Sequence, residues 1–429
     1  MNRIEKLLQK FCPDGVEFKD LGEICDALPK GTLKQQQLQN EGYPVINSGR
    51  ELYGYYSQFN NEGNAIVITS HGAYAGFTHY LQGKFWAGGL CYPYRSKNEN
   101  ELLTKFIFYY CKDKNKIIKS FVAEGSIPYI NKSLLDKLKI PIPPLEIQKE
   151  IVLILDAFTE LQAELQAELQ ARQKQYEHYR ERLLSFDELE RRARLCASLR
   201  VSVASAAIQN KNIDCHEFAT ANSRNDEPTP LVKMMSLGEV GEFVRGNGLQ
   251  KKDFVEFGVP CIHYGQIYTY YGTFTHQTKS FVSEAVAKKL KKVDSGDIIL
   301  AVTGEDKKDI CKAVAWLGDK QIVTGGHATI FKHKENPKFI AYFLQTDFFS
   351  KQKVKIAYGT KVIDVAIKDL QKIKIPIPPL KVQDELVEIL DKFDALVNDI
   401  SQGLPAEITA RKKQYEHYRE KLLSFKEKA

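Results

Sequence analysis

The sequence lacks the features that mark membrane, secreted and zinc-stabilised proteins. No apolar run approaches the ~20 residues of a membrane span, and Glu5 and Lys6 stand where a signal peptide would carry its apolar stretch. The 8 cysteines include no C-x-x-C pair, which argues against zinc ribbons and disulfide frameworks and favours reduced thiols. We therefore expect a cytoplasmic protein that does not contact a membrane.

Catalytic motifs are missing as well. The chain has no G-x-x-x-x-G-K-[ST] loop, no G-x-G-x-x-G after a strand, no Asn-Pro-Pro-Tyr, no H-E-x-x-H and no G-x-S-x-G. The 9 histidines are scattered, and His178 and His417 lie in a predicted helix, where an interfacial role is favoured over metal binding. We expect no catalytic residue, cofactor site or metal site in this chain.

The composition is that of a folded chain with several domains. Its 429 residues are 43% hydrophobic and 27% charged, so it can bury cores of ordinary size. The net charge of +7 permits binding to a polyanion without requiring it.

The sequence repeats itself. KIPIPPL occurs at 139–145 and again at 374–380, an offset of 235 residues (374 minus 139). RQKQYEHYRERLLSF at 172–186 returns at 411–425 with only two of its 15 positions changed. Upstream of each copy the likeness is weaker, as in Leu-Gly-Glu at 21–23 and 237–239. We infer two diverged copies of one α+β module, each followed by a helix that has hardly diverged.

Apolar residues after each KIPIPPL recur at steps of three and four, which predicts a coiled-coil helix. The first helix should run from Glu146 to Phe186, roughly 60 Å at 1.5 Å per residue. Gly403 and Pro405 should break the second helix, where the first has the array LQAELQAELQA at 161–171. The predicted seam and partner positions are Ile147, Ile151, Ile154, Phe158, Tyr176, Tyr179, Arg180, Leu386, Ile389, Phe393, Tyr415, Tyr418 and Arg419.

Two explanations account for the near identity of the two helices. They can simply pack on each other, or they can offer two equivalent contacts to a partner, and both can hold at once. Tyr and Arg in KQYEHYRE favour an additional partner, because these residue types are enriched at interfaces.

Loops that follow the predicted strands carry Gly, Ser, His, aromatic and basic residues. Such side chains can read base edges and hold phosphates, although each loop alone is a weak signal because turns are polar anyway. Arg50, Arg95, Lys307 and Lys361 are the predicted phosphate or base contacts, and the glycines let the backbone turn or approach closely. The predicted DNA-binding set is Ser48, Gly49, Arg50, Tyr53, Ser70, His71, Gly72, Tyr74, Arg95, Ser126, His263, Tyr264, Gln266, Thr303, Gly304, Glu305, Lys307, Lys308, His327 and Lys361.

The order of module, IPIPP-containing helix, second module and repeated helix resembles the specificity subunit of type I restriction-modification systems. The endings at 176–186 and 415–425 carry the same likeness. The resemblance implies two target recognition domains that each read one half of a bipartite duplex DNA site. It also implies two methyltransferase subunits docked on an antiparallel coiled coil, with endonuclease and translocase subunits joining them. S-adenosylmethionine, ATP and Mg are then expected on those partners.

The expected fold class is α+β, with two similar α/β target recognition domains separated by two long antiparallel coiled-coil helices in a pseudo-twofold internal repeat. Expected boundaries are 1–138 for the first domain, 139–186 for its spacer helix, 187–230 for a linker, 231–373 for the second domain and 374–429 for its spacer helix. Three alternatives stay open: the specificity subunit of another multisubunit restriction enzyme, a nuclease or methyltransferase acting alone, and a coiled-coil scaffold that binds peptides.

Overall fold

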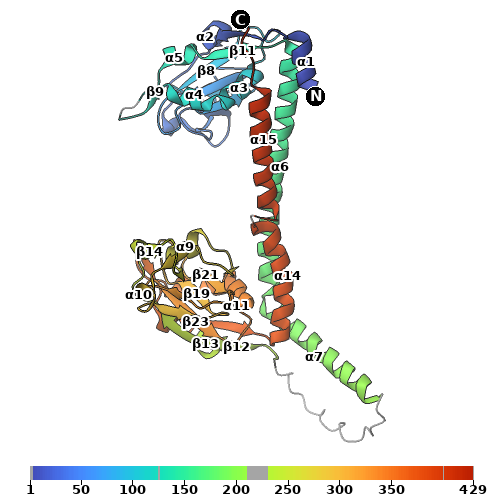
Figure 1. Cartoon of the computed structure of the whole chain (residues 1–429), viewed down its shortest axis with the longest axis vertical. Coiled ribbons are helices and arrows are strands. Elements are labelled where there is room, and N and C mark those ends of the chain that lie inside the picture. Colours follow the sequence, from blue (N-terminus) through green and yellow to red (C-terminus); the bar gives the residue numbers. More distant parts are fainter. Residues whose placement is uncertain (1–2, 124–125, 210–229, 400, 429) are drawn as a thin grey trace. The chain divides into compact units, whose positions relative to one another are not determined.

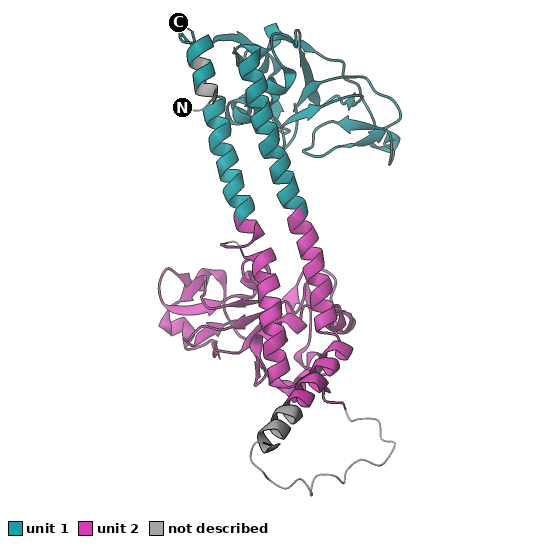
Figure 2. Cartoon of the chain, turned by 90° about the vertical axis from the view of Figure 1, so that its right-hand side faces the viewer, with its two compact units in different colours: residues 1–167, 407–429 teal, residues 168–406 magenta. Residues whose placement is uncertain are grey.

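The computed structural model describes residues 3–123, 126–209, 230–399 and 401–428 (Figure 1). The chain divides into two compact units, which are residues 1–167 with 407–429 and residues 168–406 (Figure 2). Each unit combines one α+β module with parts of two helices that are distant in the sequence. The predicted combination of helix and strand is therefore confirmed in both halves.

Unit 1 contains the first module. Its central sheet has the antiparallel strand order β2-β8-β5-β6, and a smaller sheet has the order β4-β3-β7. The elements are α1 (Arg3–Phe11), β1 (Glu17–Asp20), α2 (Leu21–Ile24), β2 (Cys25–Ala27), η1 (Gln35–Gln37), β3 (Tyr43–Ile46), β4 (Gly54–Tyr56), β5 (Ala65–Thr69), β6 (Thr78–Leu81), β7 (Trp86–Ala87), β8 (Cys91–Ser96), α3 (Thr104–Asp113), α4 (Asn115–Ser120), β9 (Val122–Ala123), β10 (Tyr129–Ile130), α5 (Lys132–Asp136), β11 (Lys139–Ile142), the first part of α6 (Leu145–Leu183) and most of α15 (Leu404–Leu422).

Unit 2 contains the second module. Its two five-stranded sheets have the strand orders β13-β23-β19-β21-β16 and β14-β17-β15-β22-β18. The elements are the rest of α6, α7 (Phe186–Gln209), β12 (Lys233–Ser236), α8 (Leu237–Val240), β13 (Gly241–Arg245), η2 (Lys251–Asp253), β14 (Phe254–Val255), β15 (Val259–Ile262), α9 (Tyr264–Thr269), β16 (Phe274–Thr275), β17 (Ser280–Val282), α10 (Glu284–Ala287), β18 (Lys291–Val293), β19 (Ile298–Ala301), β20 (Thr303–Gly304), β21 (Ala313–Trp316), β22 (Ile322–Thr324), β23 (Ala328–His333), α11 (Pro337–Phe343), α12 (Asp347–Ile356), β24 (Ile363–Asp364), α13 (Ile367–Leu370), β25 (Lys374–Ile377) and α14 (Leu380–Asn398).

The two modules share one strand plan, as the sequence repeat predicts. The first module has the neighbouring strands β2-β8-β5-β6, and the second has β13-β23-β19-β21 in the equivalent order. Both central strands, β5 and β19, are buried along their whole length, because runs of Ile, Val, Leu and Ala suit a strand covered on both faces. In each module the KIPI strand pairs antiparallel with the strand before Leu-Gly-Glu, with Asp20 opposite Lys139 and Ser236 opposite Lys374.

The predicted helix seam is present within each unit. In unit 1 the start of α6 lies beside α15, and the ring of Phe158 lies 6.1 Å from that of Tyr415 and 5.7 Å from that of Tyr418 (Figure 1). In unit 2 the ring of Tyr179 lies 5.5 Å from that of Phe393 of α14. The predicted break at Gly403 and Pro405 is confirmed, since α14 ends at Asn398 and α15 begins at Leu404.

Helix α6 comprises 39 residues, close to the predicted helix, and a second helix follows it. This helix, α7, occupies the start of the segment predicted as a linker, and residues 210–229 of that segment lie outside the described residues. The Glu190 carboxylate of α7 accepts hydrogen bonds from the backbone N–H groups of Leu231 at 3.1 Å and Val232 at 2.8 Å. Residues 231 and 232, which follow this segment, therefore bond to α7.

A buried glutamine joins each repeated helix to its module. Gln148 of α6 is fully buried, accepts from Leu103 N at 2.8 Å and donates to Glu101 O at 2.8 Å and Pro143 O at 2.7 Å. Gln383 of α14 is equally buried and donates to Pro378 O at 2.8 Å. Each amide replaces hydrogen bonds that the chain would otherwise make with water, so its loss leaves backbone groups unsatisfied.

We expect Gln148→Met to lower the free energy of unfolding of unit 1 by about 2–3 kcal/mol, because a methionine of similar size cannot bond the three backbone groups, which are buried or partly buried. The two tryptophans, Trp86 and Trp316, lie one in each unit. Urea unfolding followed by fluorescence in a Trp316→Phe background would report on unit 1 through Trp86. Gln383→Met is the matched control, and a transition shifted equally by both variants would contradict the assignment.

Candidate nucleic-acid interface

Polar loops leave the central strand of each module at the same point. Residues 70–77 follow β5, and residues 302–312 follow β19. Both loops bond to the segment that follows α4 in the first module and α12 in the second: Gly72 N donates to Pro128 O at 2.8 Å, and Val365 N donates to Val302 O at 3.0 Å. The two loops are thus equivalent in the fold although their sequences differ.

In the first module this loop and the following strand β6 contact residues 47–53, which include the predicted Ser48, Gly49, Arg50 and Tyr53. His79 Nε2 donates to Gly49 O at 3.0 Å, and the Arg50 guanidinium lies 5.1 Å from the ring centre of Tyr74. The ring of His71 is stacked on that of Tyr129, which belongs to the same segment as Ser126, at 6.0 Å. Arg50 and Tyr74 are exposed, so a guanidinium and an aromatic ring are available together at this edge.

Other predicted residues of the first module support this cluster or extend it. Ser70 is fully buried, and its hydroxyl is joined to His71 Nδ1 at 2.8 Å. Gly72 has a φ of +88°, a conformation that favours glycine. Ser48 and Tyr53 belong to the 47–53 loop.

Arg95 lies apart from the cluster. It belongs to β8, where its guanidinium donates to Asn64 O at 2.6 Å and also to Glu62 O. These bonds give Arg95 a structural role in holding the 62–64 turn. Its contact with DNA stays a prediction.

In the second module most of the predicted residues line one cleft of about 740 Å³. His263 caps α9, since its Nδ1 accepts from Gly265 N at 3.1 Å, and Gln266 Nε2 donates to Ser280 Oγ at 2.6 Å. Burial, with a smaller effect from Lys251, lowers the pKa of His263, so this imidazole is neutral at pH 7. The predicted residues that line the cleft are His263, Tyr264, Gln266, Thr303, Gly304 and Glu305.

A polar chain closes one side of this cluster. His327 Nδ1 is joined to Thr303 Oγ1 at 3.1 Å, and Thr303 Oγ1 donates to Asp364 Oδ1 at 3.1 Å. The ring of Tyr264 lies 5.0 Å from that of His327. The structure therefore brings His327 to the residues with which it was predicted to act.

The predicted lysines lie on exposed turns around the same cluster. The side chains of Lys307 and Lys361 are exposed and have no hydrogen bond or ion pair among the described residues. The loop that carries Lys307 and Lys308 is held by Lys353 of α12, whose Nζ donates to Lys308 O at 2.6 Å and Ile310 O at 2.7 Å. Burial lowers the pKa of Lys353.

Sequence reasoning missed several of these residues. The sequence does not distinguish Lys353 from the exposed lysines of α12, because its burial depends on contacts with the 302–312 loop. Lys251, Tyr268 and Lys279 also line the cleft around His263, and they come from separate elements. By contrast, the sequence does contain a signal for Gln148 and Gln383. Both are glutamine at the offset of 235 residues (383 minus 148) that relates the two copies of KIPIPPL.

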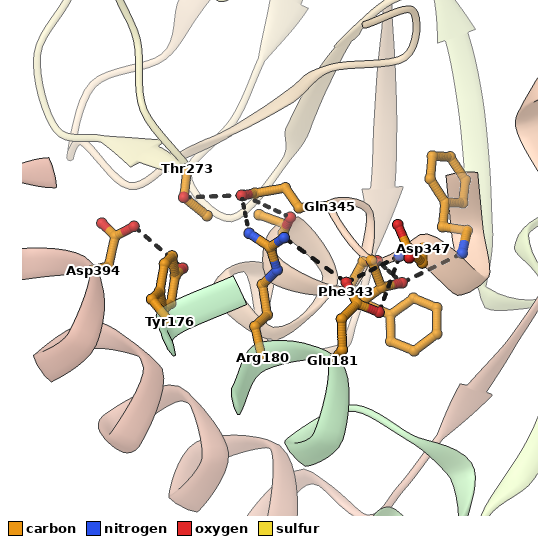
Figure 3. A network of polar contacts seen from close by, with 11 residues as sticks. Tyr176, Arg180, Glu181, Thr273, Phe343, Gln345, Asp347 and Asp394 are labelled. Atoms are coloured by element: carbon orange, nitrogen blue, oxygen red, sulfur yellow. Dashed lines mark hydrogen bonds and ion pairs between the residues drawn. The ribbon is translucent and has the colours of Figure 1, made fainter. Parts of the chain in front are cut away.

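The predicted aromatic and arginine residues of the repeated helix contact this chain itself. In unit 2, Arg180 Nη1 donates to Gln345 Oε1 at 3.2 Å, and Tyr176 Oη donates to Asp394 Oδ1 at 3.3 Å (Figure 3). In unit 1, Arg419 forms an ion pair with Asp113 at 3.3 Å. Each arginine lies 5.4 Å from the ring centre of the tyrosine one turn earlier.

The outward faces of the two repeated helices are identical and exposed. Packing within each unit accounts for the tyrosines and arginines, but it does not account for the side chains that point to solvent. These exposed and identical residues are Lys174, Gln175, Glu177 and His178 in the first copy and Lys413, Gln414, Glu416 and His417 in the second.

The described residues show little other chemistry. Within residues 3–123, 126–209, 230–399 and 401–428 no group of three or more His, Cys, Asp and Glu residues could hold a metal ion. The cysteines of this part of the chain are unpaired, and burial raises the pKa of Cys25 and Cys261 to about 12, so these thiols are protonated at neutral pH. None of the described helices is both long and apolar enough to cross a membrane.

Two modules of one plan, each with its own cluster of polar and basic loops and each joined to an almost identical helix, define a protein with two related recognition surfaces. The chain belongs to the type I restriction modification DNA specificity domain family, which it matches over residues 13–172 and 231–410. The resemblance seen in the sequence is thereby confirmed.

Individual relatives support this assignment. The chain is 30% identical to a putative type I restriction enzyme specificity subunit of Haemophilus influenzae, over 98% of each chain. It is 29% identical to the EcoR124I/EcoR124II specificity subunit of Escherichia coli, over 99% of this chain and 97% of the relative. The crystal structure of a type I S subunit from M. genitalium has a TM-score of 0.54 at 18% identity, with 95% of this chain and 96% of that chain covered, which shows the same fold.

Proposed function

We propose that this chain reads a bipartite sequence in duplex DNA, one half-site with each module, and so directs a type I restriction-modification complex. The observation that supports this most is the contrast between the repeats. The two modules keep one strand order but place different residues in their equivalent loops, Ser-His-Gly at 70–72 and Thr-Gly-Glu at 303–305. Unlike loops on a shared plan suit two unlike half-sites.

The chemistry of the clusters suits contact with DNA. Base edges are read by hydrogen-bonding side chains, and phosphates are held by Arg and Lys. Arg50 beside Tyr74 offers both kinds of contact in the first module. The exposed Lys307 and Lys361, around a cleft that contains Thr303 and Glu305, do so in the second.

The proposal assigns the chemical steps to other subunits. Two methyltransferase subunits would dock on the two equivalent helix faces, and endonuclease and translocase subunits would complete the complex. S-adenosylmethionine, ATP and Mg would bind to those subunits and not to this chain. The relative from Escherichia coli is itself named a specificity subunit of a type I enzyme. The full chain alone, incubated with duplex DNA and S-adenosylmethionine, should transfer no methyl group.

We expect Lys307→Ala with Lys361→Ala to weaken duplex binding about tenfold at 0.1 M salt, because each lost phosphate contact removes part of the gain from counterion release. Fluorescence anisotropy of the chain co-expressed with its methyltransferase subunit would measure this. Lys320→Ala with Lys334→Ala is the matched control, since these exposed lysines follow the ends of β21 and β23 that point away from the cluster. Equal affinities for both double variants would show that these loops do not contact DNA.

A further inference from the structure

A second pair of clefts occupies equivalent places in the two modules. The cleft of the first module has a volume of about 750 Å³ and that of the second about 520 Å³. Residues 73, 74, 77 and 78 line the first, and residues 308, 309, 312 and 313 line the second, each at an offset of 235. Residues 112–117 and 119 line the first from the end of α3 and from α4, and residues 344–347, 350 and 353 line the second from the connection after α11 and from α12.

The repeated helix contributes the same arginine to both clefts. Arg419 lines the first and Arg180 lines the second. These clefts are distinct from the one around His263, which lies on the other side of the 302–312 loop and shares only Asp309 with the second of them. The duplication therefore created two copies of a cleft, of which one side hardly changed while the other sides diverged.

The divergence changes the charge of the cleft. The stretch from the end of α3 to α4 lines the first cleft with Lys112, Lys114, Lys116 and Lys119, beside Asp113. The stretch from the end of α11 to α12 lines the second cleft with Leu344, Gln345, Thr346, Asp347, Ser350 and Lys353. This side of the cleft is thus basic in the first module, whereas in the second module it holds one lysine against one aspartate.

The lysines of the second cleft are also largely occupied. Lys312 Nζ donates to Tyr268 O at 3.2 Å, and Lys353 Nζ donates to Lys308 O and Ile310 O. Arg180 donates to Gln345. An ammonium or guanidinium group that already donates hydrogen bonds within the chain has fewer N–H groups left for a ligand.

The first cleft keeps its cations available. Lys116 and Lys119 are exposed on α4 and have no hydrogen bond or ion pair within the part of the chain that the structure describes. The Asp113 carboxylate is neutralised by Arg419 at 3.3 Å and Lys114 at 3.0 Å. Lys116 and Lys119 are three residues apart, so they lie on one face of the helix.

This cleft is continuous with the loop cluster of the first module. Arg50 and Tyr74 belong to the cluster and also line the cleft. A duplex bound at the loops would therefore bring its backbone to the cleft. Six Lys and Arg residues line this cleft against three acidic residues, Asp113, Glu416 and Glu420, so the cleft has a net positive charge. A concave surface of this charge beside base-reading loops suits the sugar–phosphate backbone, which carries one negative charge per ~1.7 Å of duplex.

We propose that the first-module cleft binds the phosphate backbone of duplex DNA beside the base-reading loops, without regard to sequence, and that the equivalent second-module cleft does not. This inference rests on the proposed function and adds an asymmetry to it. The half-site read by the first module is held by an additional backbone contact, and the half-site read by the second module is not.

The salt dependence of duplex affinity tests this proposal. We expect Lys116→Gln with Lys119→Gln to weaken binding by about an order of magnitude at 0.1 M salt and to make the slope of log K against log salt shallower by about 1.8, because each phosphate contact contributes about 0.9. The ratio of affinities for the cognate and a scrambled duplex should not change. Lys351→Gln with Lys355→Gln removes the same charge from exposed positions of α12 outside the second cleft and should leave the slope unchanged.

The measurement uses the full chain with its methyltransferase subunits and both duplexes. A slope that is the same in the Lys116/Lys119 variant and the wild type overturns the inference. So does a changed preference between the duplexes, because it would mean that these lysines read bases. A wild type that binds both duplexes equally would instead remove the proposed function, so the two failures are distinguishable.

Discussion

Deleting Leu165–Glu168 should move methylation to a site whose half-sites are unchanged and whose unread spacer differs by about one base pair. Helix α6 continues without interruption through this segment, so removing four residues shortens it by about 6 Å and rotates its end by a net ~40°. The twist of one base pair is about 35°. Methylation of the original site should fall at least about tenfold.

The array of LQAE units makes this deletion unusually conservative. Leu169 takes the place of Leu165, and both are buried, so the apolar stripe of the helix is preserved. Inserting one further LQAE unit should change the spacer in the opposite direction. Methylome sequencing of cells that carry each variant with the partner subunits provides the measurement. A changed half-site with an unchanged spacer would refute the role of the helix as a spacer.

Reversing the charge of one repeated helix face should remove one of two methyltransferase subunits from the complex. We expect Lys174→Glu with His178→Glu to reduce the complex from two such subunits to one, and the same change at Lys413 and His417 to do so on the other side. Both pairs are exposed and four residues apart, so each covers one face of its helix. A buried unpaired charge at an interface costs several kcal/mol, enough to abolish a contact.

The chain offers a closely matched control for this experiment. Lys149→Glu with Leu153→Glu introduces two glutamates at exposed positions of α6 that are also four residues apart. The second copy carries Asp384 and Glu388 at the corresponding positions, so acidic residues are compatible with the helix there. Mass photometry of the assembled complexes would count subunits. Two methyltransferase subunits retained in both helix-face variants would place the docking surface elsewhere.

The plan of the chain followed from the sequence because the copies repeat literally. The duplicated KIPIPPL predicted a strand and then a helix in each half, and β11 with α6 and β25 with α14 have this order. Gly403 and Pro405 predicted the break between α14 and α15, since glycine and proline disfavour helix wherever they occur. Family membership followed from the same repeat. Such features depend on local conformational preferences and on periodicity, and both can be read from the amino-acid sequence alone.

The composition of the sites was predicted only in part. Loops at 70–74 and 303–305 were found because polar residues directly follow a buried strand, but their pairing with 126–130 and 363–365 depends on long-range strand contacts. Arg95 has the same chemistry as Arg50, yet it bonds the 62–64 turn while Arg50 lies on an aromatic ring. No property of the residue itself distinguishes the two.

The amino-acid order by itself determined that there are two modules, two near-identical helices and a break in one of them, because repetition, helix periodicity and the conformational limits of Gly and Pro act over short stretches of chain. Only the tertiary structure decided which basic residues are available. Lys353 donates hydrogen bonds to two backbone carbonyls and Arg180 donates to a side-chain amide, whereas Lys116 and Lys119 bond none of the described residues. Whether a charge is free or occupied depends on what other segments fold against it, and that is a property of contacts between residues far apart in the sequence.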